Sequence, residues 1–120
     1  MQFEINNESD ISEEFLMTLL CQVGEARSAF MEAMRVARKG QFTEAEALLK
    51  SGDTALVQVH KSQTSLIGFD EGAGKVTMTL ILTHIQDHIM TTMLCRELAE
   101  EIVAIHYQLQ RSKTHEEAHI

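Results

Sequence analysis

Apolar residues recur at helical spacing along three segments of the chain, which predicts helices over residues 10–39, 43–67 and 76–111. In the first segment they return every three or four positions, at Phe15, Leu19, Val23, Ala26, Phe30, Ala33, Met34 and Ala37. In the second segment one broad side carries Leu48, Leu49, Leu56, Val59, Ser62, Gln63, Leu66 and Ile67. Short connections make the helices antiparallel neighbours, so the expected fold is an all-α, up-down-up three-helix bundle, a single domain of residues 1–120.

The expected helix ends rest on capping patterns. Asp10 with Glu13, and Thr43 with Glu46, have the three-residue spacing of a capping box. Glycines mark both connections between the helices. The polar residues 112–120 form a tail that we expect to fray.

Composition supports long helices and opposes a β-sandwich. Proline is absent, aromatic residues make up 5% of the chain, and there are six glycines. Gly52 interrupts the second helix at a cost of about 1 kcal/mol relative to alanine. It either allows another helix to pack closely or is merely tolerated.

The stretch from Val76 to Cys95 carries one formal charge, that of Asp87. A helix of a lone three-helix bundle buries one stripe and shows charges elsewhere, but this stretch has no charged face. With five threonines, two histidines, a glutamine and an aspartate it is also too polar to span a lipid bilayer. We therefore expect a homo-oligomer in which the third helix lies near the symmetry axis.

A polar cluster lies within this stretch. His84, Asp87 and His88 are spaced i, i+3, i+4, which places them on one side of the helix. Two histidines at i, i+4 could hold zinc, but Ile85 stands where a zincin has its glutamate. A neutral imidazole is also a good phosphoryl acceptor. The third interpretation is structural: buried histidines satisfied by threonines such as Thr83 or Thr91, with the aspartate fixing the register of an oligomer.

Charge and cysteine usage narrow the classes of function. A formal charge of −8 and a pI near 5.1 oppose nucleic-acid and anionic-membrane binding, and suit a partner with a basic docking face. No secretion signal precedes the first helix, so we expect a cytoplasmic protein without membrane insertion. Cys21 and Cys95 lie in helical patterns without metal-type spacing, and we expect both to be buried free thiols.

The sequence resembles a known family, the lactose/cellobiose/chitobiose-type enzyme IIA of the bacterial phosphotransferase system for sugars. The resemblance rests on His60–Ile67 (HKSQTSLI), Val76–Leu82, His84–Thr91 (HIQDHIMT) and Leu98–Ile102 (LAEEI). It extends from about Glu13 to Tyr107, nearly the whole chain. The combination of His-x-x-Gln-Thr with a later His-x-Gln-Asp-His in a charge-poor helix is specific.

The resemblance implies a subunit that trimerises into a nine-helix assembly. It implies a phosphocarrier that takes a phosphoryl group from the phosphorylated histidine phosphocarrier protein and passes it to a cysteine of the matching enzyme IIB. On the matching positions the phosphorylated residue is His84. Asp87 corresponds to the aspartate that binds a divalent cation, here expected to be Mg²⁺, shared by three subunits on the trimer axis.

Elementary chemistry agrees with these roles. Three copies of Asp87 on one axis would repel each other, so a hard divalent ion or protonation must offset their charge. His88 and Gln86 are candidates to support the phosphoryl group, and Gln63 and Thr64 are candidates to line the same groove. A non-catalytic helical adaptor with a buried polar layer remains the alternative function.

Overall fold

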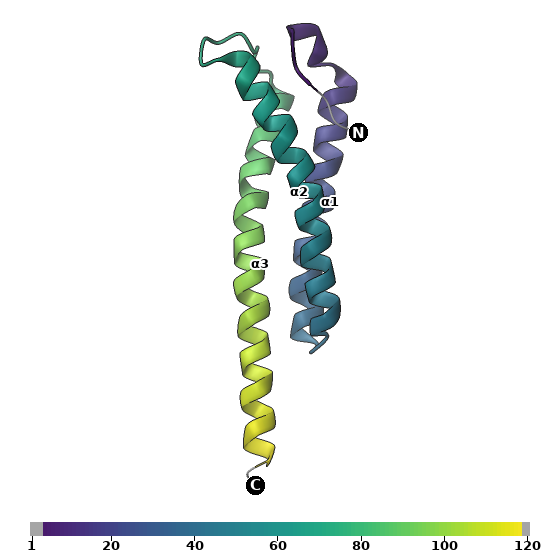
Figure 1. Cartoon of the computed structure of the whole chain (residues 1–120), viewed down its shortest axis with the longest axis vertical. Helices are drawn as coiled ribbons and strands as arrows, with labels where there is room; N and C mark the ends of the chain where they lie inside the picture. Colours follow the sequence, from purple (N-terminus) through teal and green to yellow (C-terminus); the bar gives the residue numbers. More distant parts are fainter. Residues whose placement is uncertain (1–3, 119–120) are drawn as a thin grey trace.

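The computed structural model describes residues 4–118, with side chains described up to residue 114. Its elements are a short 3₁₀ helix η1 (Glu8–Asp10) and three long helices, α1 (Glu13–Arg38), α2 (Phe42–Asp70) and α3 (Leu80–Ala118). The described residues form no strand, which confirms the all-α expectation. Successive helices run antiparallel, as expected for an up-down-up bundle, and the molecule measures 67 × 24 × 20 Å (Figure 1).

The first two helices begin in the expected places but not with the expected caps. Ser12 caps α1, because its Oγ accepts a hydrogen bond from the Phe15 N–H at 3.1 Å. Asp10 instead ends η1 and accepts from the backbone of Asn6 and Asn7. Gln41 precedes α2 without a side-chain cap, so Thr43 and Glu46 form no capping box. A capping pattern alone therefore places these starts only to within a few residues.

The third helix differs from the expectation at both ends. It begins at Leu80 rather than Val76, because the Thr79 Oγ1 accepts from the Leu82 N–H at 3.2 Å in the manner of an N-cap. Before it, the Val76 N–H donates to Asp70 Oδ1 at 2.9 Å, which ties the loop to the end of α2. At the other end α3 continues through Ala118, so the expected frayed tail is helical to that residue. The last two tail residues, 119–120, lie outside the described residues, as do residues 1–3.

The core lies between all three helices, with the most extensive packing between α1 and α2. Its largest cluster joins Phe15, Leu19, Val23, Val59, Leu66, Leu82, Ile85 and Ile89. Farther down the pair, Phe30 is fully buried against Gly52, where a Cβ atom would lie 2.5 Å from the Phe30 ring. Gly52 is therefore a close-packing glycine, which resolves the two alternatives that the sequence left open.

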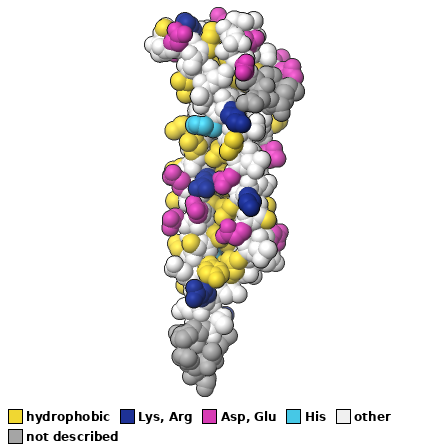
Figure 2. Space-filling view, in the orientation of Figure 1, with side chains coloured by type: hydrophobic (Ala, Val, Ile, Leu, Met, Phe, Trp, Pro, Cys, Tyr) yellow, Lys and Arg dark blue, Asp and Glu magenta, His cyan; other side chains and the backbone are white. Residues whose placement is uncertain are grey.

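Several large apolar side chains of α3 remain at the surface. Leu80, Met90, Leu94, Leu98, Ile105 and Leu109 are each at least half exposed. On the face shown in Figure 2, apolar side chains appear between acidic and basic ones along the length of the molecule. Over the described residues, none of the helices combines the length and apolar character needed to cross a membrane.

The two cysteines are free, as expected, but not both buried. Cys21 on α1 is exposed, which corrects the expectation for that residue. Cys95 on α3 is half-buried and lies 3.9 Å from the Met31 sulfur. The helical pattern predicts that both cysteines lie in helices, but it does not predict how deeply each side chain is buried.

Candidate functional site

A groove of about 520 Å³ runs between α1 and α3 and contains the polar cluster. Its α1 wall consists of Arg27, Met31 and Met34, which lie at helical spacing on one face. Its α3 wall consists of His84, Asp87, His88, Thr91, Leu94, Cys95, Leu98 and Ile102. The i, i+3, i+4 spacing therefore does bring the two histidines and the aspartate to one surface, as predicted.

The two histidines lie one helical turn apart with nearly parallel rings. Their centroids are 6.1 Å apart and the ring planes meet at 22°. His84 is exposed, whereas His88 is half-buried. The nearby threonine hydroxyls are engaged elsewhere: Thr83 donates to the Thr79 carbonyl and Thr91 to the His88 carbonyl. Because its imidazole is exposed, His84 is accessible to a reacting group, and the partly buried imidazole of His88 lies one turn away.

The groove favours the neutral form of His88. Burial, the positive charge of Arg27 and the neighbouring His84 lower the pKa of the His88 imidazole, in that order of size. The Asp87 carboxylate opposes this shift. Burial also raises the pKa of the Cys95 thiol, and Arg27 opposes it there. The charge of Arg27 thus reaches groups along the α3 wall.

Arg27 is the site residue that sequence reasoning missed. It is the one cation among the residues that line the groove, and Asp87 is the one carboxylate. Among the residues whose side chains are described, Arg27 forms no ion pair or hydrogen bond, in contrast to Arg35 and Arg96. A signal was present in the sequence, since Arg27 interrupts an apolar face shared with Met31 and Met34. Its proximity to the histidines required the register between α1 and α3.

Asp87 lies on an exposed line of α3 that we call the α3 seam, defined as Leu80, His84, Asp87, Thr91, Leu94 and Leu98. Its members alternate at spacings of four and three, the 3.5-residue period of helices that pack side by side along their length. The side chains of Leu80, Leu94 and Leu98 are 88%, 55% and 50% exposed. Asp87 lies in the middle of this exposed, partly apolar line.

The remaining predicted residues lie on α2 or on the side of α3 that faces it. The Gln63 Nε2 donates to Gln86 Oε1 at 2.9 Å, and Gln63 is 8% exposed. Thr64 is exposed on α2. None of these three residues lines the α1–α3 groove within one chain. The sequence-based expectation that Gln63 and Thr64 share a groove with His84 is therefore not met in the single subunit.

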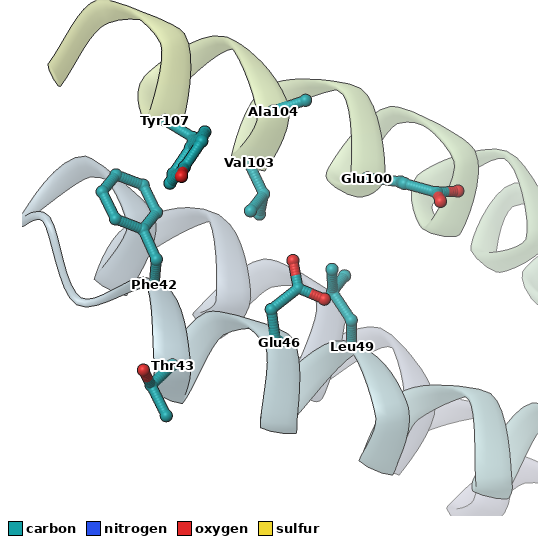
Figure 3. A pocket seen from close by; sticks show the side chains of 8 residues that line it. All are labelled: Phe42, Thr43, Glu46, Leu49, Glu100, Val103, Ala104 and Tyr107. Carbon is teal, nitrogen blue, oxygen red and sulfur yellow. The ribbon is translucent and has the colours of Figure 1, made fainter. Parts of the chain in front are cut away.

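Two further hollows lie between α2 and α3. One of about 480 Å³ contains the carboxylates of Glu46 and Glu100 and an edge-to-face pair formed by Phe42 and Tyr107, whose centroids are 5.2 Å apart (Figure 3). The other, of about 490 Å³, is mostly apolar and includes His60. Neither is lined by two imidazoles, so the α1–α3 groove is the stronger candidate for chemistry.

A single subunit offers no complete metal site. Within the described part of the chain, no three histidine, cysteine, aspartate or glutamate side chains gather closely enough to hold an ion. Asp87 supplies one carboxylate on an exposed seam. Oxygen ligands of this kind suit a hard divalent cation, but one carboxylate is too few. Any ion bound at Asp87 must draw its other ligands from water or from further copies of the chain.

Comparison with known sequences gives one consistent result. The sequence profile of the family "PTS system, Lactose/Cellobiose specific IIA subunit" matches residues 14–107. The N,N'-diacetylchitobiose-specific EIIA component of Escherichia coli K12 is 39% identical over 107 residues, which is 89% of this chain and 92% of that one. The lactose-specific EIIA component of Streptococcus mutans is 33% identical over 88 residues, 73% of this chain and 85% of that one.

Solved structures agree with the sequence relatives. The crystal structure of the cellobiose-specific enzyme IIA from Bacillus anthracis superposes with a TM-score of 0.78 at 31% identity, covering 82% of this chain and 91% of that one. A chain from the solution structures of the Escherichia coli IIA(chitobiose)–HPr complex superposes with a TM-score of 0.71 at 41% identity, covering 82% and 95%. Both similarities extend over most of the three-helix fold.

Proposed function

Since this chain belongs to the lactose/cellobiose-specific IIA family of the phosphotransferase system, we propose that it carries the phosphoryl group on His84. As a member of this family, the chain is a cytoplasmic phosphotransferase component of a sugar uptake system. The observation that carries the proposal is the exposure of His84 in the α1–α3 groove, one turn before a second, partly buried imidazole.

The donor that we propose is the histidine phosphocarrier protein. A relative 41% identical to this chain forms an IIA(chitobiose)–HPr complex, and the charge of −8 suits a basic docking face. A lone pair of the His84 imidazole forms the new P–N bond. The P–N bond to the carrier's imidazole breaks, and its electron pair stays on the carrier's nitrogen. Each ring keeps the proton on its other nitrogen, so charge and atoms balance.

The acceptor that we propose is a cysteine of the matching enzyme IIB. Its thiolate forms a P–S bond as the P–N bond to His84 breaks, and the electron pair returns to the imidazole nitrogen. Relatives of this chain serve diacetylchitobiose, lactose and cellobiose systems, and we extend this class of β-linked disaccharides to it. Such a relay needs positioning and charge stabilisation more than acid–base work from the protein.

His88 and Gln86 are the proposed supporting residues. The neutral form of His88 that the groove favours can donate one hydrogen bond to a phosphoryl oxygen on His84. Gln86 faces α2, where Gln63 fixes its amide oxygen and leaves its amide N–H groups free to donate outward. Within one chain Gln86 points away from the groove, so its action on a phosphoryl group would be through a neighbouring subunit.

We also propose that three copies meet along the α3 seam, giving a nine-helix trimer with Asp87 on its axis and with His84 at the open edge of the seam, where a partner protein can reach it. The exposed apolar side chains of the seam and its 3.5-residue period support this assembly. Three converging carboxylates would hold a divalent cation such as Mg²⁺, which would neutralise their repulsion. The proposed transfer at His84 does not require this ion, whose role would be structural.

The relay is tested by intact-mass spectrometry at neutral or alkaline pH. Wild type and His84→Gln are incubated with phosphoenolpyruvate, enzyme I and the histidine phosphocarrier protein. Transfer of one phosphoryl group adds about 80 Da to the wild-type chain, is lost in acid, and is absent from His84→Gln. His60→Gln is the matched control, because it removes an exposed imidazole of α2 outside the α1–α3 groove. A wild-type protein that gains no mass would favour the helical adaptor instead.

A further inference from the structure

Arg27 is an unpaired cation in a strongly acidic protein. The chain has 18 acidic and 10 basic residues, and among those whose side chains are described Arg38 and Arg111 also form no ion pair, but neither of them lines the groove. Arg35 pairs with Glu32 on the same helix, and Arg96 pairs with Asp53 and Glu100. Arg27 has no such contact among the residues whose side chains are described, and it faces the groove that contains His84. Its guanidinium therefore has its donors free.

The surroundings of Arg27 point to an anion as its ligand. Met31 and Met34 flank it on the α1 wall, and Leu94 and Leu98 lie across the groove, so most of its lining is apolar. Asp87 is the carboxylate that also lines the groove, and it forms no ion pair with Arg27. An apolar lining strengthens the attraction between a cation and an anion because it lowers the local dielectric constant.

We infer that Arg27 is a phosphoryl-binding residue, which donates hydrogen bonds to the oxygens of the phosphoryl group on His84. This inference rests on the proposed function, since it requires a phosphoryl group at that histidine. A guanidinium fork matches the oxygens of a phosphoryl group and can hold two of them at once. The influence of its charge on His88 and Cys95 agrees with a side chain that reaches across to α3.

The role follows from the charge that the transfer brings into the groove. The phosphoryl group in transit carries negative charge on its three outer oxygens, and a fixed cation beside it stabilises that charge. In the proposed relay the phosphoryl group arrives at His84 and leaves from the same residue. A single arginine, without a carboxylate to neutralise it, can stabilise the phosphoryl group during both steps and still release it.

The test compares Arg27→Gln, Arg27→Lys and the control Arg38→Gln, which removes the same charge from an exposed position of α1 outside this groove. Phosphorylation is followed with the phosphorylated carrier protein and, separately, with phosphoramidate, a small donor that needs no docking. We expect Arg27→Gln to be about 10- to 100-fold slower with both donors, the size of one lost charge-assisted hydrogen bond. Arg27→Lys should recover part of the rate, and Arg38→Gln should match wild type.

A ³¹P NMR titration of the phosphorylated proteins gives a second readout that a merely structural residue would not move. Loss of the nearby cation should raise the pH at which the phosphoryl group titrates in Arg27→Gln but not in Arg38→Gln. Equal rates and equal midpoints in these two variants would overturn the inference. Slowing with the carrier protein alone would also overturn it, because Arg27 would then act in docking. Wild type that takes no phosphoryl group at His84 would instead refute the proposed function, and the inference with it.

Discussion

Gly52 and Phe30 show how one missing side chain sets the distance between two helices. A Cβ atom at Gly52 would lie 2.5 Å from Cε1 of Phe30, and that ring is fully buried and cannot swing aside. By contrast, Gly68 near the end of α2 has nothing within 4 Å of the equivalent position. The two glycines share a helix and differ only in what faces them.

We therefore expect Gly52→Ala to destabilise the protein and Gly68→Ala not to. Overpacking costs about 1–3 kcal/mol, which outweighs the gain of about 1 kcal/mol in helix propensity. Gly68→Ala should be neutral or slightly stabilising. Urea unfolding at one fixed protein concentration measures both, since oligomers gain stability with concentration. A Gly52→Ala protein as stable as Gly68→Ala would show that α1 and α2 can separate at little cost.

Residue-scale prediction from sequence succeeded where it needed only one helix. The common side of His84, Asp87 and His88 follows from their spacing alone. Arg27 and the Gln63–Gln86 hydrogen bond were not found, because each depends on how two helices are aligned along their length. Contacts between helices are set by packing of whole faces, which the local pattern does not specify.

At the scale of elements, the start of α3 decides where His84 lies in its helix. The apolar run suggested a start at Val76, but Thr79 caps the helix and leaves residues 76–79 in the loop. Its Oγ1 accepts from Leu82, and its carbonyl accepts from the Thr83 N–H at 2.9 Å. Periodicity predicted that the helix exists, whereas its first residue depends on the side-chain cap at Thr79 and on the hydrogen bond from the Val76 N–H to Asp70.

Thr79→Ala should cost about 1 kcal/mol of stability, because it leaves the Leu82 N–H without its acceptor. Thr79→Ser should keep most of the stability. The matched control is Thr77→Ala, which removes an exposed loop hydroxyl that donates to Glu8. Hydrogen exchange gives a local readout, and we expect faster exchange at Leu82 in Thr79→Ala alone. Equal stability and equal exchange in the two alanine variants would show that the first turn of α3 is held by packing instead.

At the scale of the whole molecule, the single chain leaves an apolar seam uncovered. The sequence indicated this, because the stretch before Cys95 has one formal charge and no charged face. The structure adds that α3 turns Leu80, Leu94 and Leu98 outward rather than into its own bundle. A monomer with this surface would expose a patch of the kind that marks protein interfaces. The proposed trimer covers it and brings the Asp87 carboxylates together.

The proposed trimer predicts opposite responses to removal of the ion and to removal of the carboxylates. Chelation of divalent ions by EDTA should weaken the wild-type trimer, because three carboxylates then repel each other on the axis. Asp87→Leu should stay trimeric with or without EDTA, since it removes the repulsion and adds apolar surface. Light scattering reads the outcome as a mass of 13.5 kDa or three times that value. Glu25→Leu, which removes an exposed carboxylate of α1 outside the seam and the groove, should respond to EDTA as wild type does. A monomeric Asp87→Leu protein would contradict the axial position of Asp87, and a wild-type trimer indifferent to EDTA would contradict the shared ion.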